Sequence, residues 1–248
     1  MNKQSVASKG DRFQTFVPQL RERRDRIVYQ GRLGRIGATR NSRYLLVAIA
    51  AAVSLLAFVV AVAIHPWATA AVGVFAVALI AGGWPAATGV AELRRVNRIY
   101  SHSTIILCAG LCALLITLFD NRDERLTLLP AIVAVGVVGS FIVELVRGEG
   151  ATGRLESVIS CITGVLAAVS VAGWLALASF YQSHHSSILI MVSGLGIALI
   201  LAAFGIRMIS AGPKDGPRRG ALTLGVTPVA FVGVLSYLIA IFIYGVIV

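Results

Sequence analysis

The sequence predicts an all-α membrane protein, a polytopic bundle of about seven transmembrane helices. Hydrophobic residues make up 57% of the chain, charged residues only 13%, and the mean hydropathy is +0.85, whereas about one-quarter of a soluble domain is charged. The apolar residues come in runs of about twenty, the length that a helix needs to cross ~30 Å of hydrocarbon. Because these runs are apolar on every face and lipid offers the backbone no hydrogen-bond partners, helices are expected instead of barrel strands.

Seven apolar stretches are predicted to span the membrane. The predicted spans are Tyr44 to Ile64, Trp67 to Ala91, Thr104 to Phe119, Leu128 to Val146, Val158 to Tyr181, Ile188 to Ile206 and Ala221 to Val248. The first two are divided at "IHPW", residues 64–67, because the combined stretch is too long for one crossing and the proline favours a tight hairpin. Residues 44–248 therefore form the predicted transmembrane domain, preceded by a separate arm, residues 1–43.

The distribution of basic residues predicts the orientation. All 22 Lys and Arg residues except Arg122 and Arg125 fall on one side of the predicted bundle, and cytoplasmic segments of membrane proteins carry an excess of these residues. The sequence therefore predicts a multi-pass protein of the plasma membrane, with a cytoplasmic N-terminus and, given seven spans, an external C-terminus.

The arm, residues 1–43, is strongly basic and differs from the rest of the chain. Phe13, Phe16, Val17 and Leu20 recur every three to four residues, which favours a partly helical, partly disordered segment on the membrane surface. Each Lys or Arg near an anionic leaflet contributes about 1 kcal/mol, so membrane lipids are the expected partner. Nucleic acid is the less favoured partner, because the arm adjoins the membrane and no binding module accompanies it.

Two charged stretches interrupt the apolar sequence and resemble each other. "AELRRVNRIYS" covers residues 91–101 and "VELVRGEGATGRLES" covers residues 143–157; the Glu-Leu-x-Arg element recurs after 52 residues and the following Arg and Ser after 56. Each stretch joins one span to the next on the basic side. The pattern favours a repeated two-helix hairpin, and the alternative is chance recurrence of helix-end Glu and Arg pairs.

The carboxylates of these stretches are the candidate functional or pairing positions. Glu92 with Arg95 and Glu144 with Arg147 are each three residues apart, a spacing at which helical side chains pair. Local pairing at solvated helix ends is the favoured interpretation, and a shared pocket is the alternative.

The same elements carry a resemblance to a known family. An apolar helix ending in Glu-Leu-x-Arg, a short basic loop and a second such hairpin are similar to the membrane portion of bacterial phosphatidate cytidylyltransferases, roughly over residues 40–180. The resemblance implies synthesis of CDP-diacylglycerol. That activity depends on a C-terminal signature dense in Lys, Asp, Gly and His that holds divalent metal. The comparable stretch here, "GPKDGPRRG" at 212–220, has a single acid, Asp215, and no His, so no catalytic residue is carried over.

The residues themselves predict no catalytic, cofactor or metal site. Metal-dependent phosphoryl transfer needs convergent carboxylates, and none of the 11 acids lies near a span centre. His184 and His185 lack further ligands nearby. Cys108 and Cys112 share one face of the third span and, like Cys161 in the fifth, are predicted to be packing residues.

Proline and glycine predict where helices bend or approach closely. Pro85 in "GGWP" and Pro228 in "TP" are candidate helix breaks, with tolerated kinks as the favoured alternative. Small residues allow close packing of helix backbones, in an intramolecular bundle or in a homo-oligomer. The expected packing positions are Gly82, Gly83, Gly89, Ala109 with Ala113, Gly136 with Ser140, Gly194 with Ala198, and Gly225.

Three functional classes remain open. The favoured class is a non-catalytic membrane component that packs with lipid or protein partners and needs no cofactor. A small permease for a neutral or lipidic solute is the alternative, suggested by the repeat and the prolines. A phospholipid-synthesis enzyme related to the cytidylyltransferases is the third.

Overall fold

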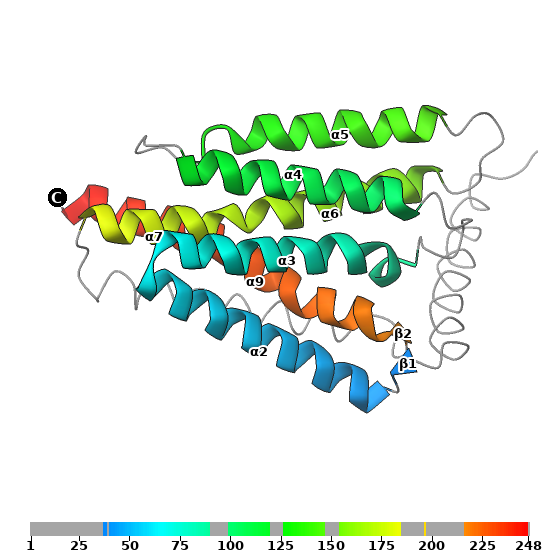
Figure 1. Cartoon of the computed structure of the whole chain (residues 1–248), viewed down its shortest axis with the longest axis horizontal. Coiled ribbons are helices and arrows are strands. Elements are labelled where there is room, and N and C mark those ends of the chain that lie inside the picture. The colour runs from blue at the N-terminus through cyan, green and yellow to red at the C-terminus, as the bar shows by residue number, and fades with distance from the viewer. Residues whose placement is uncertain are drawn as a thin grey trace, which may run out of the picture.

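The protein is a bundle of long helices with one very short pair of strands (Figure 1). The structure, a computed structural model, describes residues 37–38, 40–89, 99–119, 126–146, 154–184, 196 and 216–247. Its elements are β1 (Gly37–Ala38), α2 (Arg40–Ile64), α3 (Pro66–Ala87), α4 (Ile99–Phe119), α5 (Leu129–Val146), α6 (Arg154–Ser170), α7 (Ala172–His184), β2 (Gly216–Pro217) and α9 (Arg218–Ile247).

The described helices provide six segments that are long and apolar enough to cross a membrane. Helices α6 and α7 together make one of them, Arg154–Ser183, and α2, α3, α4, α5 and α9 make the others. Six of the seven predicted spans are therefore confirmed as apolar helices. The remaining one, 188–206, lies outside the described residues except for residue 196. Helix α7 ends at the opposite end of the bundle from the start of α9 (Figure 1). The count of seven stays a prediction.

The turn between α2 and α3 is as tight as the sequence predicts. Only His65 separates the two helices; its ring Nδ1 accepts a hydrogen bond from the backbone N–H of Trp67 at 3.2 Å, which caps α3. Pro66 follows as the first helical residue, where a missing N–H costs nothing because that group has no intrahelical partner. A helix start at His65-Pro66 thus divides the long apolar stretch into two spans.

Helix α3 ends four residues before the predicted boundary at Ala91. Thr88 caps the helix, with its N–H bonded to the carbonyl of Trp84 at 3.0 Å, and Gly89 follows with φ of 74°. Left-handed backbone costs glycine nothing and most other residues more. Gly89 is therefore a helix terminator, whereas the sequence analysis assigned it to close packing.

Helices α6 and α7 meet at Val171, where the bonding pattern tightens to three residues. The N–H of Val171 bonds to Ala168 at 3.3 Å and that of Trp174 bonds to Val171 at 3.2 Å. The interruption lies against α9: a Cβ on Gly173 would collide with the backbone of Val234. Helices α7 and α9 thus touch backbone to backbone at Gly173.

Prolines do not end the helices that contain them. Helix α3 continues through Pro85 to Ala87, and α9 continues through Pro228 to Ile247. The structure therefore agrees with the favoured interpretation of tolerated prolines, and neither Pro85 nor Pro228 ends its helix.

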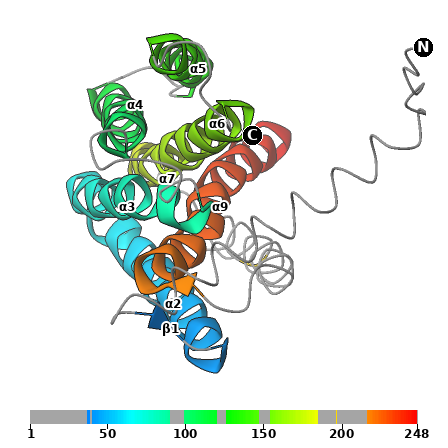
Figure 2. The same cartoon turned by 90° about the vertical axis from the view of Figure 1, so that its right-hand side faces the viewer.

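In cross-section, α5 and α2 occupy opposite edges of the bundle, with α3, α6, α7 and α9 between them (Figure 2). In the most apolar 18-residue stretch of α2 and of α5, 22% of residues are buried, against 72% in the α6–α7 span. Most of the central core, including Phe58, Ile80, Val165 and Trp174, belongs to one apolar cluster. The edge helices therefore bury a much smaller share of their residues than the α6–α7 span does.

One end of the bundle carries the short pair of strands. There β1 pairs antiparallel with β2, Gly37 opposite Pro217 and Ala38 opposite Gly216. We call this the β1–β2 end. Helices α2, α4, α6 and α9 begin there, and α3 and α5 end there (Figure 1).

Candidate functional site

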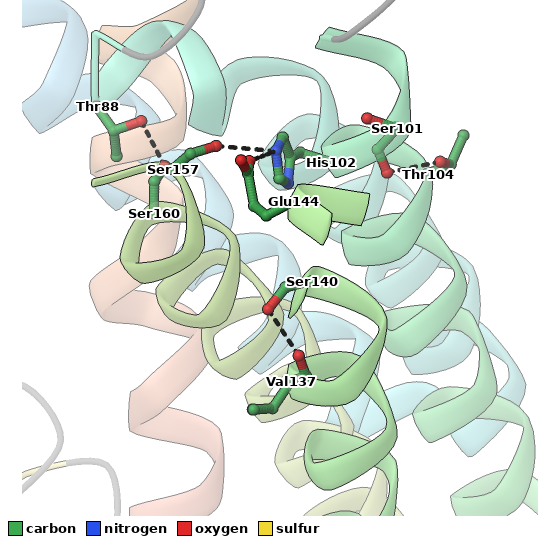
Figure 3. A network of polar contacts seen from close by, with 9 residues as sticks. All are labelled: Thr88, Ser101, His102, Thr104, Val137, Ser140, Glu144, Ser157 and Ser160. Carbon is green, nitrogen blue, oxygen red and sulfur yellow. Dashed lines mark hydrogen bonds and ion pairs between the residues drawn. The ribbon is translucent and has the colours of Figure 1, made fainter. Parts of the chain in front are cut away.

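A buried cluster of polar side chains lies at the β1–β2 end, where α4 begins, α5 ends and α6 begins (Figure 3). It consists of His102 of α4, Glu144 of α5 and Ser157 of α6, which we call the His102 junction. These residues are 4%, 4% and 1% exposed, respectively. His102 and Glu144 are ionisable. Ionisable groups inside membrane spans are rare and costly, so both residues are candidates for function.

Both partners of His102 contact the same ring nitrogen. Nε2 lies 3.2 Å from Oε1 of Glu144 and 2.9 Å from Oγ of Ser157. An ionised carboxylate only accepts hydrogen bonds, so with Glu144 ionised the hydrogen resides on Nε2, which donates to Glu144. The Ser157 hydroxyl oxygen then shares that hydrogen as a second acceptor. One imidazole hydrogen therefore joins three helices.

This arrangement differs from that of a catalytic triad. In a triad, the acid bonds to one ring nitrogen and the nucleophilic hydroxyl bonds to the other, so that histidine removes the hydroxyl proton while the acid holds the imidazole. At the His102 junction, the carboxylate and the hydroxyl compete for Nε2. In this geometry Ser157 is not prepared for nucleophilic attack, and the contacts instead connect helices.

A second polar contact ties α3 to α6 beside the junction. The hydroxyls of Thr88 and Ser160 lie 2.7 Å apart, and the indole N–H of Trp84 donates to the carbonyl of Ser160 at 2.7 Å. Gly164, one turn further along α6, leaves room for Trp84 and Ile106. Together with the His102 junction, these bonds connect α3, α4, α5 and α6 at one end of the bundle (Figure 3).

Glu144 differs from its predicted environment. The sequence analysis expected a solvated helix-end carboxylate, but the structure buries Glu144 between α5, α4 and α6 and bonds it to His102. The difference arises because α4 and α6 extend beyond their predicted starts, Thr104 and Val158, and cover the end of α5. The other candidates, Glu92, Arg95 and Arg147, lie outside the described residues.

The sequence analysis did not identify His102 or Ser157 as partners of Glu144. A signal was available for Ser157, because it closes the second copy of the repeated stretch, and its counterpart Ser101 directly precedes His102. The repeat therefore pointed to the correct end of the bundle. The repeat did not indicate that Glu144 and Ser157, both in the second copy, would contact His102, which directly follows the first copy.

Cysteines occupy two kinds of position. Cys161 is buried, whereas Cys108 and Cys112 are exposed and line a cavity of about 510 Å³ between α4 and α5. Within the residues that the structure describes, no group of three or more His, Cys, Asp or Glu side chains is placed to hold a metal ion. The polar cluster and the cavity are thus the two features that bear on function.

Comparison with known proteins gave no match to a family model, to a curated protein or to a solved structure.

Proposed function

We propose that this chain is a non-catalytic integral membrane component that acts by packing its spans against lipid or protein partners. The observation that carries the proposal is the His102 junction. Its imidazole contacts both the carboxylate and the hydroxyl across three helices, and all three side chains are buried. Interhelical hydrogen bonds in membranes contribute ~0.6 kcal/mol each on average, so the junction supports a structural use of these groups.

The edge helices provide the surfaces for such packing. Helix α2 exposes Leu45, Val53 and Leu56, and α5 exposes Val135 and Leu145. In the hydrocarbon of a membrane, apolar faces of this kind contact acyl chains or the spans of another protein, including a second copy of this chain. The basic arm, residues 1–43, adds an electrostatic attraction to the anionic lipids of the membrane surface.

The proposed orientation puts the β1–β2 end in the cytoplasm of a plasma-membrane protein. It is supported by Arg154, Arg218 and Arg219, which begin α6 and α9 at that end, since basic residues concentrate on the cytoplasmic side. Reporter fusions test it: fusions after residue 183 and at the C-terminus should be external, and one after residue 214 should be cytoplasmic. A cytoplasmic C-terminus would contradict the seven-span orientation.

Purification of the full chain with its surrounding lipid tests the proposed function. We expect mass spectrometry to find a retained lipid or partner protein, and we expect no CDP-diacylglycerol to form from phosphatidate, CTP and Mg²⁺. Synthesis that disappears in a folded His102→Ala variant would overturn the proposal in favour of the enzyme. A small solute retained at one molecule per chain would favour the permease instead.

A further inference from the structure

The cavity between α4 and α5 is an elongated apolar groove. Ile105, Cys108, Cys112 and Ile116 line it from α4, and the face of α5 from Leu128 to Gly139 lines it from the other side. From Ile105 to Ile116 a helix rises about 16 Å, roughly half of the ~30 Å hydrocarbon thickness. Exposed Cys108, Cys112 and Val135 are part of its lining, so the groove is accessible from the surface of the bundle.

Hydrocarbon fits this groove better than water. A volume of about 510 Å³ equals that of about seventeen liquid water molecules at ~30 Å³ each. Ordered water needs two to four polar partners, yet the side chains lining the groove are aliphatic apart from two thiols, which are weak hydrogen-bond donors. Both lining helices are long and apolar enough to span a membrane, so acyl chains surround the groove.

The size of the groove favours one acyl chain over a helix. A helix with side chains is about 10 Å or more in diameter, whereas neighbouring helix axes are themselves only about 8–10 Å apart, so the space between α4 and α5 is narrower than a helix. A partner span or a second copy of this chain would therefore insert only a ridge of side chains. A single extended hydrocarbon chain is narrow enough to lie along the groove between α4 and α5.

The charge at the β1–β2 end suits a phosphate. Ile105 lies one turn from His102, which contacts Ser157, and Arg154 begins α6 one turn before Ser157. The Arg154 Nε is buried, and none of the described residues supplies it with an acceptor. Glu144, the nearby carboxylate of α5, is bonded to His102. Arg154 therefore lies at the same end of the bundle as the Ile105 end of the groove, and its buried Nε favours an anionic group such as a phosphate as acceptor.

We propose that the α4–α5 groove binds one acyl chain of a membrane phospholipid, with the lipid phosphate at the β1–β2 end near Arg154. The inference rests on the proposed function, because it specifies the lipid that packs against the spans.

Photolabelling tests the groove directly. The full chain is placed in nanodiscs that contain a phospholipid with a diazirine in its acyl chain, and the adducts are mapped by mass spectrometry. Gly139→Leu fills the groove, since a Cβ at Gly139 meets only the end of Ile105 at 3.9 Å. Gly82→Leu on α3 is the matched control, because nothing lies within 4 Å of a Cβ at Gly82. Ala131→Phe is a second blocking variant if Gly139→Leu fails to fold.

The expected result is a concentration of adducts on the groove-lining faces of α4 and α5, reduced several-fold by Gly139→Leu or Ala131→Phe and unchanged by Gly82→Leu. Arg154→Gln should lower labelling by an anionic phospholipid while the chain still folds. Adducts spread evenly over α2 and α5, or labelling insensitive to both blocking variants, would overturn the groove site. So would a partner protein crosslinked through Cys112 in native membranes. None of these outcomes affects the test for CDP-diacylglycerol synthesis, so failure of the lipid site and failure of the proposed function are distinguishable.

Discussion

The contact of α7 with α9 and the contact of α5 with α4 represent two ways of joining helices in one bundle. At the first, Gly173 and Gly233 bring the backbones together: a Cβ on either glycine would collide with Val234 or with Trp174. At the second, Gly139 has open space beside it and a cavity of about 510 Å³ separates the helices. The first contact is closed along its surface, and the second is closed only at one end, by Glu144 and His102.

The difference shows that small residues alone do not produce close packing. Glycine permits two backbones to approach, but the approach occurs only where a neighbour presents a matching surface. Gly83 faces Thr223 and Gly225 faces the backbone near Val47, whereas nothing lies within 4 Å of a Cβ at Gly82. Glycines in the centre of the bundle are therefore packing residues, and those on an outer face are not.

The largest expected effect is at the α7–α9 contact. Gly173→Ala should destabilise the protein by about 3 kcal/mol or more, because overpacking a close contact usually costs 1–3 kcal/mol and here the neighbour is rigid backbone of Val234. Thermal stability of the purified protein, followed by fluorescence-detected size exclusion, measures the loss. Gly82→Ala is the control and should be neutral or slightly stabilising. Equal stability of the two variants would contradict the close contact.

Removing the contact between Glu144 of α5 and His102 of α4 should have the next largest effect on stability. Glu144→Ala should cost about 2 kcal/mol, because it removes the carboxylate that bonds to Nε2 of the buried His102 ring. Glu144→Gln should cost less than about 1 kcal/mol, since the amide oxygen still accepts from Nε2. Denaturant titration of both variants separates these outcomes. A Glu144→Ala protein as stable as wild type would show that the junction does not hold α5.

Loss of a single buried hydrogen bond at the α7–α9 contact should destabilise the protein less than Glu144→Ala does. The Trp174 indole N–H donates to the carbonyl of Val229 at 2.8 Å, and the ring stacks on Phe58 with centroids 5.1 Å apart. Trp174→Phe retains an aromatic ring and loses the donor, so we expect a destabilisation of about 1 kcal/mol. Trp67→Phe on α3, whose ring is exposed, is the control for the loss of an indole. A loss above about 3 kcal/mol would indicate repacking of the core instead.

The smallest effect is expected in the α4–α5 groove. Gly139→Ala should change stability by less than about 0.5 kcal/mol or raise it slightly, because alanine favours the helix and its Cβ meets only Ile105 at 3.9 Å. Gly136→Ala, one turn earlier on α5, should be less stable than Gly139→Ala, because its Cβ would lie 2.8 Å from Val165. Similar melting temperatures for the two variants would mean that α5 moves freely on α6.

The spans could be predicted from the sequence because run length and hydropathy are local properties. Six of the seven predicted spans correspond to described apolar helices, and the hairpin at His65 agrees because proline marks a helix start. The end of α3 was predicted too late, since nothing in composition distinguishes the terminating Gly89 from the packing glycine Gly83.

Tertiary contacts could not be predicted in the same way. The bond between His102 and Glu144 joins residues 42 apart on two helices, so it depends on how α4 and α5 are placed. The close approach at Gly173 and Gly233 could not be predicted for the same reason, because it depends on where α7 and α9 lie in the bundle. Gly83, Gly136 and Gly225, by contrast, were predicted as packing positions and lie close to neighbouring helices.

The short pairing of β1 with β2 has a consequence for biosynthesis. It joins Gly37 and Ala38, just before the first span, to Gly216 and Pro217, just before the last. Gly225 of the last span also packs on the backbone of α2 at Val47. At synthesis rates of 5–20 residues per second, α2 waits roughly ten to forty seconds for these partners to leave the ribosome. Helix α2 therefore enters the membrane before α9 exists, and its own hydrophobicity and the hairpin with α3 hold it there until α9 arrives.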